Sequence, residues 1–364
     1  MRTEKHSFLS ALAGPQDLGG GPAFWIVFTV MALALLAFPV VGSSFHLSNL
    51  ANFFVYVPMG LGLGLLWGYG GILSFGQGAF FGIAGYTYGI IAANLALTPG
   101  GTVLAAVGAI VASVVAAALF GYLVFFGEVS AWIIPLLTLV LSLILETFMG
   151  QTAGYQWRVG SILLGGYNGM TGIPSIHVGP LEFGGASVAL YLLAVMALLA
   201  TYLGLRWLVN TRYGHVVVGV RDDVERTKML GYNAPLVQVQ VFALASGLAG
   251  LSGVLYVSWG NYMSPSSMGL YAATLPVIWT AVGGRSSLIA VAVSTVALKW
   301  LADALAVRGG EYAFLIMGAL LLGTMLFFPA GCVVSLARLW QRWRNAVTSA
   351  RSARVDEATN RRPS

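Results

Sequence analysis

Ten stretches of mostly apolar residues follow one another along this chain of 364 residues, and nine of them have about the 20-residue length that a membrane-spanning helix needs. Only 8% of the residues are charged, whereas a soluble domain carries roughly 25%. So few charged side chains cannot cover the surface of a soluble protein. The sequence therefore predicts an all-α polytopic membrane protein with about ten transmembrane helices, or nine if 271–283 does not cross. The predicted spans are 22–42, 49–68, 72–93, 101–126, 131–149, 186–208, 236–258, 271–283, 286–305 and 311–329.

Glycine is unusually frequent, with 47 residues, and it often recurs every four residues within the predicted spans, as at Gly60, Gly64 and Gly68. Small residues at this spacing let helix backbones approach each other closely. The stretch 68–78 differs, because it has five glycines in eleven residues. Irregular backbone at membrane depth is tolerated only where protein or a water-filled cavity satisfies its polar groups. We therefore expect a broken or re-entrant segment near 68–78 that lines a passage.

The basic residues are concentrated in two places, which sets the expected orientation. Segment 211–235 carries three arginines and a lysine, and seven arginines lie in the last 27 residues. Loops rich in Lys and Arg stay in the cytoplasm, so both termini are expected there. A basic tail could also bind nucleic acid, but in a chain of this composition we expect a membrane protein with no nucleic-acid partner. The expected layout is a cytoplasmic N-terminal segment 1–21, a transmembrane domain 22–330 with an outer loop 150–185 and a cytoplasmic segment 211–235, and a basic cytoplasmic tail 331–364.

The sequence lacks the residue patterns of several enzyme classes. None of the three lysines, Lys5, Lys228 and Lys299, follows the glycine run of a phosphate-binding loop, so no ATPase motif of that type is present. The four histidines are far apart in sequence, and Cys332 is the only cysteine, so we expect neither a metal site nor a disulfide. These features favour a transport subunit over an enzyme.

Ionisable residues inside membrane spans often mark ion pathways. Glu146 lies near the outer end of its predicted span, where it can reach the interface. Lys299 and Asp303 are four residues apart, so they share a helix face and can pair. We interpret this pair as an anchor toward the outer interface. A proton or sodium relay would need several carboxylates or histidines near the midplane, so a stand-alone channel or secondary transporter stays as the alternative of another class.

The polar segment 211–235 has the signals of a short capped helix. Asp222 or Asp223 can cap its start, Arg226 lies toward its C-terminal end, and Gly231 can terminate it. A short helix held between two spans on the cytoplasmic side is expected to be a docking element for another protein. The alternative is an amphipathic loop lying on lipid headgroups.

Four blocks of the sequence are distinctive. The first is rich in glycine, the second lies in the outer loop, the third includes the cytoplasmic segment, and the fourth carries a Trp-Thr-Ala-Val-Gly-Gly-Arg run. The blocks are 66–86; 165–174; 221–226 with 230–232 and 246–253; and 264–267 with 279–285. Together they resemble permease subunits of the branched-chain amino-acid and urea ABC importers, and they occur in the order of that family, between about residues 50 and 330.

The resemblance implies the partners of the chain. Such a permease pairs with a second, homologous permease subunit in the lipid bilayer of the cell inner membrane. Two cytoplasmic ATP-binding-cassette ATPases bind it, and a periplasmic or extracellular solute-binding protein delivers the solute. The chain itself would bind no cofactor, because the ATPases hydrolyse the ATP. The translocation-pathway candidates are Ser74, Gln77, Tyr86 and Tyr88, and the ATPase-coupling candidates are Arg221, Asp222, Asp223, Glu225, Arg226 and Gly231.

The expected solute is a branched-chain or other hydrophobic amino acid, and urea or a short amide is the alternative. Two positions depart from the urea-type pattern. The run 272–278 has no carboxylate ahead of the Trp-containing block, and Gln77 stands where urea-type chains commonly carry His. Both departures argue against urea.

Overall fold

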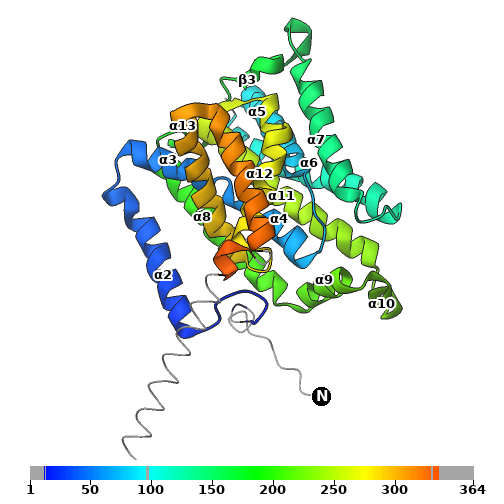
Figure 1. The fold of residues 1–364 in the computed structure, drawn as a ribbon. Helices are drawn as coiled ribbons and strands as arrows, with labels where there is room; N and C mark the ends of the chain where they lie inside the picture. The colour runs from blue at the N-terminus through cyan, green and yellow to red at the C-terminus, as the bar shows by residue number, and fades with distance from the viewer. Residues whose placement is uncertain (1–11, 13, 96–97, 329–330, 336–364) are drawn as a thin grey trace, which may run out of the picture.

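The computed structural model describes residues 12, 14–95, 98–328 and 331–335, and these form a bundle of helices (Figure 1). The predicted all-α polytopic class is confirmed. The helices are α2 (Pro22–Ala37), η1 (Phe38–Val40), α3 (Ser44–Phe54), α4 (Val57–Leu63), the π-helical turn η2 (Gly64–Tyr69), α5 (Gln77–Leu95), α6 (Gly101–Phe126), α7 (Ile134–Gly150), α8 (Val188–Val209), α9 (Arg212–Asp222), α10 (Val224–Met229), α11 (Ala234–Gly260), α12 (Leu270–Gly283) and α13 (Leu288–Phe327).

Each predicted span has a counterpart among these helices. In the described part of the chain, seven helices are long and apolar enough to cross a membrane, and three shorter apolar helices occupy the other predicted positions. The limits of α6 coincide with the predicted span 101–126. The helix α12 has 14 residues, or about 21 Å, against a hydrocarbon thickness of roughly 30 Å. Because α12 is shorter than the hydrocarbon layer is thick, the described part of the chain has ten crossings if α12 spans the membrane and nine if it does not.

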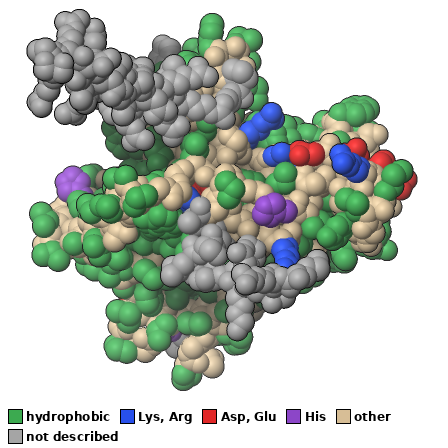
Figure 2. All heavy atoms as spheres, turned by 90° about the horizontal axis from the view of Figure 1, so that it is seen from below, with side chains coloured by type: hydrophobic (Ala, Val, Ile, Leu, Met, Phe, Trp, Pro, Cys, Tyr) green, Lys and Arg blue, Asp and Glu red, His purple; other side chains and the backbone are tan. Residues whose placement is uncertain are grey.

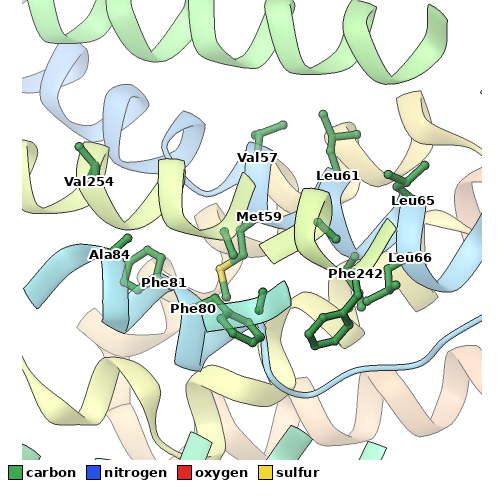
Figure 3. Packing of buried hydrophobic residues seen from close by; sticks show 14 of the residues in the cluster. Val57, Met59, Leu61, Leu65, Leu66, Phe80, Phe81, Ala84, Phe242 and Val254 are labelled. Atoms are coloured by element: carbon green, nitrogen blue, oxygen red, sulfur yellow. The ribbon is translucent and has the colours of Figure 1, made fainter. Parts of the chain in front are cut away.

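The centre of the bundle is α11, which packs against α4, α5 and α6 (Figure 1). Side chains of α4, η2, α5 and α11 meet in one apolar core, where Phe80 and Phe242 pack edge to face (Figure 3). Glycine allows the close approach, because a Cβ on Gly253 would lie 2.2 Å from the carbonyl oxygen of Phe81. A Cβ on Gly60 would lie 2.4 Å from Oγ1 of Thr295. The predicted role of small residues in helix packing is therefore seen in the structure.

The helix α13 covers two predicted spans, 286–305 and 311–329. Its two apolar parts are Leu288–Val307 and Leu315–Phe327. The chain reverses between them, because Arg285, just before α13, lines the same pocket as Phe328, just after it. The structure therefore contains the two antiparallel passes that the hydropathy predicted, although helical geometry continues through the turn.

Short strands lie at one end of the bundle, which we call the hairpin end, and α9 and α10 lie at the opposite end, which we call the α10 end (Figure 1). The predicted outer loop 150–185 contains most of the strands. The pair β3–β6 connects this loop to the residues that follow α11. The antiparallel pairs are β1 (Arg158–Val159) with β2 (Ile162–Leu163), β3 (Met170–Thr171) with β6 (Tyr262–Met263), and β4 (Ile176–Val178) with β5 (Leu181–Phe183).

The predicted domain limits at the two termini are only partly covered by the structure. Of the predicted basic tail, residues 336–364 lie outside the described residues, as do residues 1–11 and 13 of the N-terminal segment.

Candidate functional site

The backbone is interrupted where the glycine-rich stretch predicted a break. Regular helix stops at η2 and resumes only at Gln77, so residues 71–76 are not helical. The buried hydroxyls of α7 satisfy this backbone: the amide of Phe75 donates to Oγ1 of Thr138 (3.0 Å), and Oγ of Ser142 donates to the Phe75 carbonyl (3.2 Å). This is how non-helical backbone is stabilised inside a membrane protein. The break separates the π-helical turn η2 from α5, and we call the stretch from η2 to α5 the interrupted span.

Gln77 and Ser74, two of the four predicted pathway residues, lie together at this break. Both side chains are fully buried. Oγ of Ser74 accepts a hydrogen bond from the amide of Gly76 (3.1 Å), whereas neither Nε2 nor Oε1 of Gln77 has a partner in the described part of the chain. An unpaired buried polar group costs about 1–3 kcal/mol and calls for an explanation. Gln77 also begins α5, where the helix dipole is positive.

Tyr86 and Tyr88, the other two predicted pathway residues, lie further along α5 toward the hairpin end. The hydroxyl of Tyr88 donates to the carbonyl of Pro174 (2.9 Å), so it anchors the loop between α7 and α8. The hydroxyl of Tyr86 is buried and has no partner among the described residues. Tyr86 is nine residues beyond Gln77, or about 14 Å along the helix. The structure therefore brings Ser74 and Gln77 together and separates the two tyrosines from them.

Segment 211–235 folds as two short helices, α9 and α10, and the second of these is the predicted capped helix. Asp223 is its N-cap, because Oδ1 accepts a hydrogen bond from the amide of Arg226 (2.9 Å). After α10 the chain turns at Gly231, whose φ of +89° favours glycine. The sequence signals did not predict α9 as a separate helix.

The tip of this segment is both apolar and charged. Met229 is 87% exposed and Leu230 is 71% exposed. Beside them, Nζ of Lys228 lies 2.9 Å from Oε1 of Glu225 in an exposed ion pair. Figure 2 views this end directly and shows Lys, Arg, Asp and Glu side chains gathered on one side of it. Exposed apolar side chains rimmed by charges are typical of a surface that binds another protein.

Arg221 connects α9 to the interrupted backbone. Its Nη1 donates to the carbonyl of Gly68 in η2 (2.9 Å), and its Nε also donates to Oδ1 of Asp222 (2.9 Å). Gly71 has a φ of +73°, and a Cβ there would lie 2.5 Å from Cγ of Arg221. Of the six coupling candidates, Arg221 is therefore in direct contact with the chain that leads through the break to Gln77.

The structure also shows a polar cluster at the α10 end that was not predicted. The guanidinium of Arg206, near the end of α8, is fully buried, and its Nη1 lies 3.4 Å from Oδ2 of Asp17. Its Nε donates to the carbonyl of Leu12 (2.7 Å), and its Nη1 also donates to the hydroxyl of Tyr202 (2.7 Å). Residues 12 and 14–19, which we call the N-terminal strap, therefore wrap around this arginine.

Asp17 also binds the start of α13. Its Oδ1 accepts hydrogen bonds from Oγ of Ser287 (2.8 Å) and from the amide of Leu288 (3.0 Å). Burial raises the pKa of the Asp17 carboxyl, while the hydrogen bond from Ser287 and the charge of Arg206 oppose that rise. The only sequence signal for this cluster is a single Asp in a glycine-rich stretch and an Arg inside an apolar span, and 189 residues separate them.

The described residues contain no group of three or more His, Cys, Asp or Glu side chains that could hold a metal ion. The arrangement consists of an exposed helical tip, an arginine contact and an interrupted span. In it, the Arg221–Gly68 contact joins the segment that carries the exposed tip to the backbone next to the break.

Comparison with known proteins shows the family to which the chain belongs. The family model for the permease component of branched-chain amino-acid transport systems matches residues 45–325, which is most of the chain. Two curated relatives are high-affinity branched-chain amino-acid transport system permease proteins LivM. The one from Salmonella typhimurium is 24% identical over 76% of this chain and 67% of its own length, and the one from Escherichia coli is 23% identical over 89% and 79%. No solved structure is significantly similar. The matched range begins at the start of α3 and ends within α13, so it contains the interrupted span and the α9–α10 segment. Because the match covers most of the chain, the chain belongs to the family of permease components of branched-chain amino-acid transport systems.

Proposed function

We propose that this chain forms half of the passage of an ATP-driven importer for branched-chain and other hydrophobic amino acids. Its family and the names of its relatives support the solute class. The proposed partners are a second homologous permease subunit, two cytoplasmic ATP-binding-cassette ATPases and a solute-binding protein on the outer face. The ATPases would hydrolyse the ATP, so the chain binds no cofactor. The α10 end would face the cytoplasm of a cell with the importer in its inner membrane.

The contact between Arg221 and Gly68 carries this proposal. An ATPase that binds the exposed tip at Met229 and Leu230 would move α10. It would also move α9, because only one residue separates the two short helices. Arg221 then transfers the movement to Gly68, at the last turn before the break. A non-helical stretch changes its backbone angles more easily than a helix does, so Gln77 and the start of α5 are the parts that would move. A passage of this kind must alternate between two arrangements, and the ATPase biases which one is populated.

The double variant Arg226→Glu with Gly231→Pro tests this role. Proline fixes φ near −65°, which is incompatible with the φ of +89° at Gly231, and the glutamate reverses a charge beside the tip. In proteoliposomes that contain the complete importer, we expect ATP-driven leucine uptake to fall by roughly tenfold or more, together with loss of ATPase co-purification.

The matched control is Gly179→Pro at the hairpin end. Gly179 also has a positive φ (+58°) and no atoms within 4 Å of an added Cβ, like Gly231. This variant should retain the ATPase subunits. Unchanged uptake and unchanged ATPase binding in the double variant would refute the coupling role of α10.

A further inference from the structure

An ion pair lies inside the membrane-spanning part of α13, in surroundings that the sequence did not indicate. Nζ of Lys299 is 2.5 Å from Oδ1 of Asp303, and only 15% of the Lys299 side chain is exposed. Lys299 lies over the ring of Tyr56, with Nζ 5.2 Å from the ring centroid. The lysine therefore packs against the interior of the bundle.

The carboxylate of Asp303 belongs to a polar cluster formed by α13, α3 and Tyr56, which lies between α3 and α4. Its Oδ2 accepts a hydrogen bond from Nδ2 of Asn52 in α3 (3.1 Å), while Oδ1 of Asn52 is buried without a partner in the described chain. Tyr56, whose ring lies under Nζ of Lys299, belongs to the same cluster. Tyr56 in turn stacks on Phe81 of α5 (5.9 Å between centroids), one turn from Gln77. The cluster is thus connected to the interrupted span.

A hollow of about 460 Å³ opens onto this cluster, and it combines polar and apolar walls. Asp303 lines it with 39% of its side chain exposed, beside Asn49 and His46. The apolar wall includes Leu50 and Phe53.

A charged side chain facing lipid is costly, and ionisable residues inside spans almost always face a bundle interior or a water-filled path. The exposed part of Asp303 therefore points to a solvated or protein-covered space. Asp303 lines the hollow next to the apolar wall, and its ion-pair partner Lys299 lies behind it, 15% exposed and outside the lining of the hollow. An α-amino acid with an aliphatic side chain has the complementary features, which are an ammonium, a carboxylate and an apolar group.

We propose that Lys299 and Asp303 form a binding site for the charged groups of the transported amino acid. Asp303 accepts hydrogen bonds from the ammonium, Lys299 donates to the carboxylate, and the apolar wall with Leu50 and Phe53 takes the aliphatic side chain. The internal ion pair is exchanged for two pairs with the zwitterion, so the net charge of the site stays zero. This proposal rests on the proposed function, because it names the contacts of the same solute.

The experiment makes two measurements. Direct binding of radiolabelled leucine is measured on the importer purified without its solute-binding protein, and leucine uptake is measured in proteoliposomes that contain the complete importer together with that protein. The variants are Asp303→Asn, Lys299→Met and the double variant that carries both. Each single variant should weaken leucine binding by about tenfold or more, the loss expected for one charged hydrogen bond. The double variant leaves no unpaired charge, so it should regain the thermal stability of the wild type without regaining leucine binding.

Two leucine analogues separate a binding role from a structural one. Isocaproate lacks the ammonium of leucine, and leucinamide lacks its carboxylate. The wild-type importer should prefer leucine to both, Asp303→Asn should lose the preference over isocaproate, and Lys299→Met should lose the preference over leucinamide. Normal binding and uptake by the double variant would overturn the site while leaving the proposed function in place. A wild-type importer that takes up no hydrophobic amino acid would instead overturn the proposed function.

Discussion

Replacing Arg206 with Met is expected to destabilise the protein by about 3–5 kcal/mol, the cost of breaking a buried ion pair from one side. The guanidinium is fully buried and satisfies the carboxylate of Asp17 as well as backbone carbonyls of the N-terminal strap. Methionine fills a similar volume but donates no hydrogen bond. The strap, α8 and the start of α13 would lose their shared contact, and the melting temperature in detergent should fall by several degrees or more.

Lys228→Met is the matched control for Arg206→Met, because it breaks an ion pair of the same kind at the surface. Lys228 pairs with Glu225 at 2.9 Å, and their side chains are 37% and 74% exposed. Surface pairs contribute only about 0–1 kcal/mol, so this variant should melt close to the wild type. Equal melting temperatures for both variants would contradict the structural role of the strap.

Replacing Arg221 with Ala is expected to lower ATP-driven leucine uptake by roughly tenfold, while the importer still assembles and hydrolyses ATP. The variant removes the hydrogen bond to the Gly68 carbonyl and the packing against Gly71, but it leaves the exposed tip of α10 intact. The ATPases should bind as before, and their movement should no longer reach the interrupted span. Uptake and ATP hydrolysis, measured on the same proteoliposomes, give the ratio that reports this loss.

Asp222→Ala isolates the contact that matters. Asp222 is 62% exposed and bonds to Arg221, so its removal leaves the arginine free to donate to Gly68. The ratio of uptake to ATP hydrolysis should stay near the wild-type value. If Asp222→Ala lowers the ratio as much as Arg221→Ala, the surface ion pair and not the contact with Gly68 carries the coupling.

The sequence predicted best the features that depend on neighbours along the chain. The run 101–126 is uniformly apolar and bounded by glycines, and it is a single helix with those limits. The five glycines of 68–78 predicted the interruption, because glycine disfavours a helix and permits the positive φ at Gly71. Asp223 and Gly231 predicted the start and the end of α10, because capping is a local interaction.

The features that the sequence did not predict depend on residues that are far apart. Asp17 meets Arg206 only when the N-terminal strap folds back under α8, and nothing near either residue indicates the pairing. Hydropathy and spacing place Lys299 and Asp303 on one face of a predicted span but do not indicate which residues they contact. Their contacts with Asn52 and Tyr56 come from the packing of α3 against α13, across about 250 residues of chain.

The central claim is that solute crosses this chain only when an ATPase moves the α9–α10 segment and, through it, the interrupted span. The most direct measurement is accumulation of radiolabelled leucine in proteoliposomes, with the complete importer or with this chain alone, in the presence of ATP or a non-hydrolysable analogue. We predict accumulation against a gradient only for the complete importer with ATP. Equal leucine flux through the purified chain alone, without nucleotide, would contradict the claim.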